Sequence, residues 1–199
     1  MLFAAAGLAA CGGGGSDTPT SSTTAPPAAA PAPGPAPAPA PSPAPAPAPT
    51  TTGSTCGIAD FAATALARVN QLRAAGADCR TGGKFAPAAA LTWSALLTQS
   101  AEGLSQDMVT NNFFSHTGSN GSTLGTRVDA TGYAWSSLGE NIAAGYPSID
   151  AVMTGWMASD GHCANLMNLG FNQVGLVCVP GTAANTYNTY WTMDLATSR

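Results

Sequence analysis

Apolar residues recur at three- and four-residue spacings in several stretches of this sequence, and such spacing is typical of one buried face of an α-helix. The first stretch covers residues 58–75 and is followed by Gly76, a residue type that commonly ends helices. The second covers residues 91–108. We expect an amphipathic helix in each stretch, with Asn70 and Arg73 of the first helix in solvated or capping roles.

Two further helices are indicated by residues that suit helix starts. Ser122 is placed to cap a helix that ends near Gly132, because a serine hydroxyl can accept a hydrogen bond from a free backbone amide of the first turn. Ser148 has the same position before an apolar face that includes Trp156, and Asp150 suits the positive first turn of that helix. These two segments complete a predicted set of four helices.

The period of the apolar pattern changes late in the chain. In residues 171–179 and 190–196, successive side chains belong alternately to two sets, as on the two faces of a β-strand. This pattern predicts two β-strands that pair across the connection between them. Helices come first and strands last, without a regular β-α-β alternation. This order predicts an α+β fold in which an antiparallel sheet is covered by helices.

A different pattern occupies the N-terminus. Residues 1–10 are small and apolar, and they run into Leu8-Ala9-Ala10-Cys11, after which the chain turns to glycine and polar residues. This pattern predicts a signal peptide over residues 1–11, and its last four residues resemble the bacterial lipobox, whose cysteine becomes the lipidated first residue. The run is too short to span a bilayer as a helix, which takes about 20 residues. We expect export, and a lipid on Cys11 that anchors the protein to a membrane.

Residues 12–55 contain thirteen of the 16 prolines, and Asp17 is their only charged residue. Such a composition cannot build a core, and alternating alanine and proline favour an extended polyproline II spacer. A Pro-rich ligand for a recognition domain is the alternative, which the absence of flanking basic residues disfavours. The folded domain is therefore expected over residues 56–199, a length sufficient for one hydrophobic core.

The chain carries few charges, with ten carboxylates, six basic residues and a formal net charge of −4. No run of lysine or arginine occurs in the sequence. Nucleic acid is therefore not expected as a partner, because its phosphates require clustered positive charge.

Five cysteines are present, an odd number. With Cys11 assigned to a lipid, an even set of four remains, which suits disulfides in an exported protein. Three pairings are open, of which we favour Cys56–Cys79, across the first helix, and Cys163–Cys178. A cysteine zinc site is the alternative, and the absence of any C-x-x-C pair disfavours it.

Glu140, one of two glutamates, lies in the small and otherwise uncharged segment 138–145. A buried carboxylate needs hydrogen bonds or a counter-charge, so donors must come from elsewhere in the chain. The sequence offers two histidines, His116 before this segment and His162 after it. We predict that these three side chains meet in one cleft, with Asn141 beside Glu140. The alternative is that the histidines are unrelated surface or core residues.

Several short motifs occur in an order that resembles one family. They are Ala90-Leu91-Thr92-Trp93, Phe114-Ser115-His116, Gly139-Glu140-Asn141-Ile142, the segment from Trp156 to His162 with Asn165-Leu166-Met167 after it, and Val174-Gly175. Together they resemble the CAP superfamily of cysteine-rich secretory proteins, antigen 5 and pathogenesis-related 1, and most of all its bacterial SCP-like members. The resemblance implies an α-β-α sandwich with a central antiparallel sheet.

The resemblance also implies a site. In many eukaryotic members two histidines and two glutamates line a cleft, which sometimes holds a divalent metal such as zinc. His116, Glu140 and His162 take three of these four positions, while Ser159 stands where the second glutamate would be. Asp160 also departs from the family pattern, because bacterial relatives usually have proline there.

Two classes of function fit these residues. Two imidazoles and one carboxylate can hold zinc with an open fourth position, which would make a metal-dependent, peptidase-like hydrolase. The same side chains can also shape a binding cleft without turnover, and the family has binding and signalling roles. Because the fourth ligand is missing, we favour a non-catalytic extracellular module. We expect it to be a monomer and to bind a lipid, a small molecule or a cell-envelope ligand.

Overall fold

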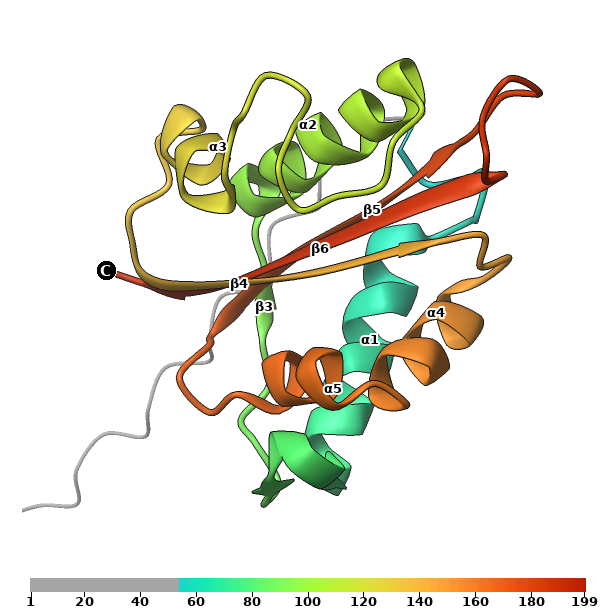
Figure 1. The fold of residues 1–199 in the computed structure, drawn as a ribbon. Coiled ribbons are helices and arrows are strands. Elements are labelled where there is room, and N and C mark those ends of the chain that lie inside the picture. The colour runs from blue at the N-terminus through green and yellow to red at the C-terminus, as the bar shows by residue number, and fades with distance from the viewer. Residues whose placement is uncertain (1–53) are drawn as a thin grey trace, which may run out of the picture. The chain divides into compact units, whose positions relative to one another are not determined.

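The computed structural model describes residues 54–199, where a four-stranded sheet lies between two groups of helices (Figure 1). The strands are β3 (Thr92–Trp93), β4 (Trp135–Ala144), β5 (Gln173–Pro180) and β6 (Thr189–Ser198), in the order β3-β5-β6-β4. The predicted signal peptide, Cys11 and residues 12–53 of the predicted spacer lie outside the described residues. Within the described part, no helix is long and apolar enough to cross a membrane.

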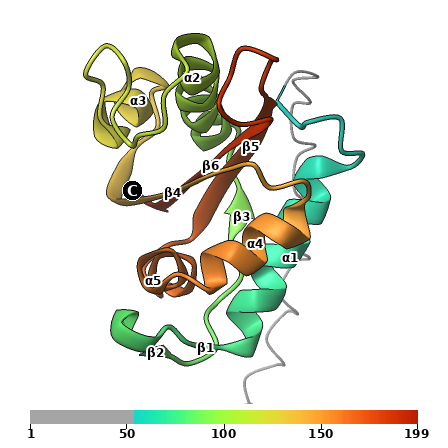
Figure 2. The ribbon, with the colours of Figure 1, turned by 45° about the vertical axis from the view of Figure 1, so that its right-hand side comes forward.

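Helices cover both faces of this sheet. On one face lie α2 (Ala95–Asn111) and α3 (Leu124–Ala130), and on the other lie α1 (Phe61–Ala75), α4 (Ile149–Met157) and α5 (Asp160–Met167) (Figures 1 and 2). A small hairpin of β1 (Ala77–Asp78) and β2 (Lys84–Phe85), joined by the 3-10 turn η1 (Arg80–Gly82), packs against α5. The predicted α+β sandwich is confirmed. Its sheet is antiparallel except for β3, which runs parallel to β5.

The helix boundaries follow local capping chemistry. The Ser148 hydroxyl accepts a hydrogen bond from the backbone N of Ala151 at 3.2 Å, so it caps α4 as predicted. The cap of α3 is Thr123 rather than Ser122, because its side chain and that of Thr126 complete a reciprocal capping box. Gly76 ends α1 with φ at 70°, a backbone conformation that glycine adopts without steric cost.

The start of α2 differs from the prediction. Residues 91–93 are not helical, because Thr92 and Trp93 pair with β5 as strand β3. The helix begins only at Ala95, after Ser94, whose hydroxyl accepts a hydrogen bond from the backbone N of Leu97. Trp93 has the spacing of a helical position, but its backbone pairs with β5 and is therefore extended.

Strand β6 is buried on both faces. Trp191, Met193 and Leu195 belong to the core shared with α1, α4 and α5, whereas Tyr190 packs with residues of α2. The polar side chains on the α2 face are buried too, and Thr192 makes a 2.7 Å hydrogen bond with Ser105 of α2. The strands predicted at residues 171–179 and 190–196 are confirmed.

Arg73 is not solvated, contrary to the prediction from sequence. It lies fully buried in α1, and its guanidinium donates to four backbone carbonyls at 2.8–3.3 Å. Those carbonyls belong to Ala89, Leu166, Asn168 and Phe171. Burial lowers the pKa of Arg73 from its ordinary value. The side chain therefore ties α1 to the turn that joins α5 to β5.

Four cysteines form two disulfides, as the even count suggests, but the favoured pairing was wrong. The bonds are Cys56–Cys178 and Cys79–Cys163, with Cα atoms 5.3 and 5.6 Å apart. The first bond follows from a backbone contact, because Thr55 pairs with Cys178 of β5 and so brings Cys56 next to Cys178. A Cys56–Cys79 bond would have to cross the 15-residue helix α1, which is about 22 Å long, whereas bonded Cα atoms lie within about 7 Å.

Candidate functional site

Glu140 lies on β4, the strand at one edge of the sheet, with only 4% of its side chain exposed. One of its carboxylate oxygens, Oε1, lies 2.7 Å from Nδ1 of His116. The other, Oε2, accepts a hydrogen bond from Nη2 of Arg127 at 2.6 Å. The predicted contact between Glu140 and His116 is thus present, and both carboxylate oxygens already have a partner.

Arg127 was not identified as a site residue from the sequence. This residue of α3 keeps only 8% of its side chain exposed, and its Nη1 donates to the backbone carbonyls of His116 and Ser122, each at 3.1 Å. It therefore supplies the counter-charge for Glu140 and fixes the loop that carries His116. A signal was available, since Arg127 is the only basic residue between Lys84 and Arg199.

A second buried carboxylate lies beside Glu140. Asp194 of β6 is its register partner, is fully buried, and has no hydrogen-bond partner for either carboxylate oxygen among the described residues. Burial, and next the neighbouring carboxylate of Glu140, raise the pKa of Asp194 well above its ordinary value. The proton of Asp194 is therefore held more tightly than that of an ordinary aspartate, because two adjacent buried carboxyl groups lie beside one arginine.

Asp194→Asn is expected to stabilise the protein at pH 7. The pKa of Asp194 is raised in the folded chain, so as pH rises above about 4 the unfolded chain releases this proton first. The contribution of Asp194 to stability therefore falls as pH rises from the unfolded pKa through the folded one. Asparagine keeps the shape and removes this titration. Melting temperatures from pH 4 to 8 should show a gain over the parent that grows with pH. A loss at pH 7 would mean that Asp194 is charged and paired.

Neighbouring residues of β4 point to opposite faces of the sheet, which separates the predicted cleft residues. Asn141 is fully buried on the α5 side, where its Nδ2 donates to the backbone carbonyl of His162 at 3.0 Å. Nδ2 of Asn165 donates in turn to Oδ1 of Asn141 at 3.0 Å and to the carbonyl of Glu140 at 3.1 Å. Asn141 thus attaches α5 to the edge strand and is not open to a ligand.

His162 belongs to α5, and its ring is half-buried at the edge of the sheet. Burial lowers the pKa of His162, and the proximity of His116 lowers it further. The two histidines are thus close enough to influence each other. Of the two histidines, however, His116 is the one that is hydrogen-bonded to the Glu140 side chain.

The residues present do not fit a metal centre. Among residues 54–199, no group of three or more His, Cys, Asp or Glu side chains is placed to hold an ion. Glu140 would also have to give up both Arg127 and His116 before it could act as a ligand. The predicted coordination of zinc by His116, Glu140 and His162 does not match this geometry.

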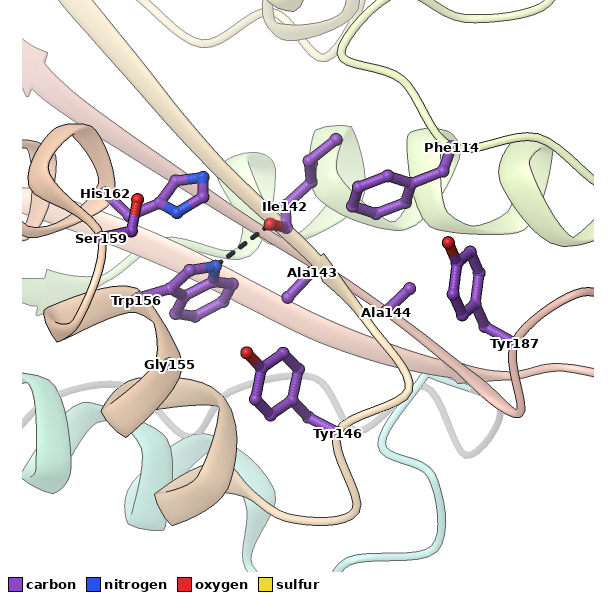
Figure 3. Close-up of a pocket in the computed structure, with 10 residues that line it drawn as sticks. All are labelled: Phe114, Ile142, Ala143, Ala144, Tyr146, Gly155, Trp156, Ser159, His162 and Tyr187. Carbon is purple, nitrogen blue, oxygen red and sulfur yellow. Dashed lines mark hydrogen bonds between the residues drawn. The ribbon is translucent and has the colours of Figure 1, made fainter.

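A pocket of about 300 Å³ opens beside this cluster, along the outer edge of β4 (Figure 3). Its walls come from the loop after α2, from β4, from the start and end of α4, from α5 and from the β5–β6 connection. The lining residues are Phe114, Ile142, Ala143, Ala144, Tyr146, Gly155, Trp156, Ser159, His162 and Tyr187. His162 is the only one of the predicted cleft residues among them, and the aromatic residues were not assigned to a site from sequence.

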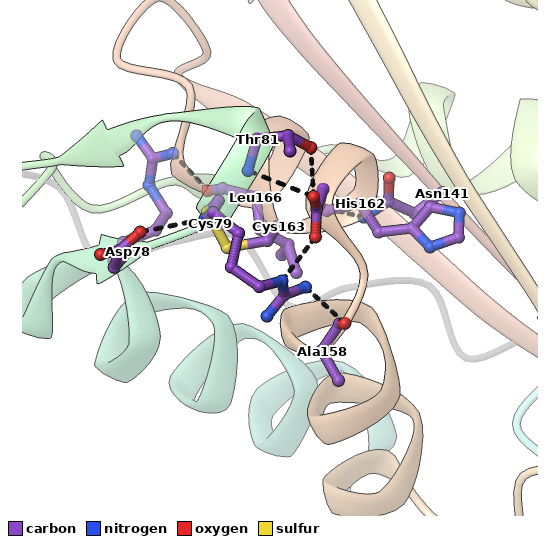
Figure 4. The surroundings of a disulfide bond; sticks show 11 residues. Asp78, Cys79, Thr81, Asn141, Ala158, His162, Cys163 and Leu166 are labelled. Carbon is purple, nitrogen blue, oxygen red and sulfur yellow. Dashed lines mark hydrogen bonds and ion pairs between the residues drawn. A yellow bond between two sulfur atoms is a disulfide. The ribbon is translucent and has the colours of Figure 1, made fainter.

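The disulfide Cys79–Cys163 holds the segment that carries His162 (Figure 4). Beside it, the Asp160 carboxylate at the start of α5 accepts hydrogen bonds from Nε of Arg80 at 2.6 Å and from the backbone N of Thr81 at 3.2 Å. Hydrogen bonds from Thr81 and Arg80 lower the pKa of Asp160. Asp160, which departs from the family pattern, therefore fastens the β1–β2 hairpin to the first turn of α5.

Part of this chain is similar in sequence to known proteins. The Bacillus subtilis proteins YkwD, named as uncharacterized, and YlbC, named as an uncharacterized membrane protein, are 36% and 34% identical over 83 and 88 residues. These matches cover 40% and 44% of this chain but only 31% and 25% of the two relatives, so the chain spans less than a third of the relatives' length.

A solved structure of an extracellular Bacillus anthracis protein containing an SCP domain is 32% identical, with a TM-score of 0.48. The match covers 55% of this chain and 34% of that one. The model of the cysteine-rich secretory protein family, CAP, matches residues 66–195, which is more than half of the chain and includes every element from α2 to β5. The chain therefore belongs to the cysteine-rich secretory protein (CAP) family.

Proposed function

We propose that this protein is a non-catalytic extracellular binding module whose ligand enters the pocket along β4. The observation that carries the proposal is the engagement of Glu140. Both of its oxygens are held by side chains of this chain, so it is not free to act as a base or a metal ligand. The pocket beside it is open and lined by aromatic rings with a few polar groups, the usual composition of a ligand site.

A metal-dependent hydrolase using His116, Glu140 and His162 is the second candidate from sequence. It requires an open coordination position and a free carboxylate. The arrangement supplies neither, because Arg127 neutralises Glu140, and His162 on α5 makes no hydrogen bond or ion pair with that carboxylate. The Arg127–Glu140 ion pair therefore favours the binding module.

A hydrolysis screen on peptides and esters, run with and without added zinc, tests the proposal. We expect no turnover by the parent, and we expect Glu140→Gln to cost only about 1–3 kcal/mol of stability, because the amide oxygen still accepts a hydrogen bond from Arg127. Glu102→Gln, at the only other glutamate, is the matched control. Zinc-dependent turnover that disappears in Glu140→Gln but not in Glu102→Gln would overturn the proposal in favour of a hydrolase.

The location of the protein is part of the same proposal. Two disulfides favour an oxidising compartment such as the cell surface. The apolar run that ends in Leu8-Ala9-Ala10-Cys11 supports export with a lipid on Cys11, and the Ala/Pro segment after it suits a spacer between membrane and domain. The ligand would then belong to the cell envelope or its surroundings.

Cys11→Ser is expected to abolish lipid attachment. Cells fed a fatty-acid analogue should label the parent protein in the membrane fraction, whereas the variant should be unlabelled and should leave that fraction. Cys56→Ser is not a suitable control because Cys56 is in a disulfide, so Ser16→Ala serves instead. Equal labelling and membrane association of parent and Cys11→Ser would contradict a lipid anchor at this residue.

A further inference from the structure

The pocket along β4 is lined by aromatic rings and by polar side-chain groups that have no hydrogen-bond partner in the described part of the chain. Tyr146 and His162 accept hydrogen bonds at their backbone carbonyls, whereas the phenol hydroxyl and the imidazole make no hydrogen bond to residues 54–199. Ser159 precedes α5 without capping it, and its hydroxyl makes no hydrogen bond to another residue of the described part. Figure 3 shows these three side chains around the floor formed by Trp156 and β4.

The far end of the pocket is also aromatic. The rings of Phe114 and Tyr187 meet edge to face with centroids 5.9 Å apart, and they remain 44% and 40% exposed. They come from the loop after α2 and from the β5–β6 connection, at the opposite end of the pocket from His162 (Figure 3). Exposed rings at the mouth of a pocket offer flat faces on which a ligand can stack.

The charge of the pocket restricts its ligand. Among residues 54–199, no aspartate, glutamate, lysine or arginine lines it, and burial lowers the pKa of His162, so this ring is neutral at pH 7. The pocket thus offers neither a cation for a phosphate or carboxylate nor an anion for an amine. Its ligand should be uncharged.

An added peptide strand does not fit this edge of the sheet. The outward carbonyl of Ile142 already accepts a hydrogen bond from the indole Nε1 of Trp156 at 3.1 Å, and that of Glu140 accepts one from Asn165. These side chains block the acceptors that an incoming strand would need. A purely apolar chain fits poorly as well, because it would cover Tyr146, Ser159 and His162 without pairing their polar atoms.

We propose that the pocket binds an uncharged sugar ring, as a free saccharide or as part of a neutral glycan. The C–H face of such a ring stacks on an aromatic face, while its hydroxyls can both donate to and accept from Tyr146, Ser159 and His162. The volume of about 300 Å³ suits one or two rings, at the small end of ligand pockets. This inference rests on the proposed binding function and names its ligand class.

Saturation-transfer NMR and calorimetry with the full chain test the inference. The probes are triacetylchitotriose, maltotriose and glucose, so that glycan and free sugar are compared, with palmitate and phosphatidylcholine vesicles as apolar competitors. We expect saturable binding of at least one saccharide. Tyr146→Leu should weaken it at least tenfold and Ser159→Ala several-fold, whereas Tyr133→Phe, at a tyrosine outside the pocket, should leave it unchanged. Near-ultraviolet circular dichroism verifies that each variant is folded.

The outcomes separate this inference from the function it rests on. The sugar assignment is overturned if no saccharide binds at millimolar concentration. It is also overturned if neither Tyr146→Leu nor Ser159→Ala changes the affinity for the saccharide. Binding of palmitate or vesicles that depends on Tyr146 would overturn the sugar but keep the binding module. Zinc-dependent hydrolysis would overturn the binding module itself.

Discussion

Arg127→Met is expected to lower the free energy of unfolding by about 3–5 kcal/mol. Both partners of the Arg127–Glu140 pair are buried, and removal of one leaves an uncompensated charge in the interior. The effect should be large here because Glu140 would keep only His116 as a side-chain partner, beside the buried carboxyl group of Asp194. The loop 116–122 would also lose the two hydrogen bonds that hold it. Urea unfolding monitored by tryptophan fluorescence measures the change.

The matched control for this prediction is Arg68→Met. Arg68 pairs with Asp150 at 3.1 Å, but the Asp150 side chain is 82% exposed, so the expected cost is below about 1 kcal/mol. The double variant Arg127→Met with Asp194→Asn should recover part of the loss, since it removes the neighbouring carboxyl group. If Arg127→Met costs no more than Arg68→Met, the Arg127–Glu140 pair does not stabilise the site.

Arg73→Lys is expected to destabilise the protein by about 3 kcal/mol, although it keeps the positive charge. A lysine ammonium is a point charge and cannot reproduce the planar fork that donates to four carbonyls. Each carbonyl left unpaired in the interior costs about 1–3 kcal/mol, and burial already disfavours the charge.

Arg73→Met tests the same site without charge. It should cost at least as much as Arg73→Lys, because every one of the four carbonyls then loses its donor. Thermal and urea unfolding of both variants measure the loss. A lysine variant within about 1 kcal/mol of the parent would show that the charge, and not the geometry of the four hydrogen bonds, matters at this position.

The sequence predicts the elements that depend on local signals. The helices over α1 and α4 and the strands β5 and β6 follow from apolar spacing and caps, because each lays a continuous face on the core. Strand β4 was not predicted. Its residues from Gly139 to Ala143 are all buried on both sides of the strand, so no alternation of polar and apolar positions remains.

The site was predictable in part. The contact between Glu140 and His116 follows from the need of a buried carboxylate for donors in a chain with two histidines. Arg127 and Asp194 reach Glu140 from α3 and from β6, through contacts that only the tertiary fold creates. The disulfide pairing failed for the same reason, since proximity along the chain is not proximity in the sheet.

The central question is whether the side chains around Glu140 form a metal-free cluster or a zinc site. Calorimetric titration of zinc into the purified, metal-free protein at pH 7.5 tests this most directly. We expect no stoichiometric binding, because Arg127 and His116 already occupy both oxygens of Glu140. Glu140→Gln should give the same flat titration as the parent. One zinc ion bound per chain, lost in Glu140→Gln at an unchanged melting temperature, would contradict the account and establish the metal site that the geometry does not support.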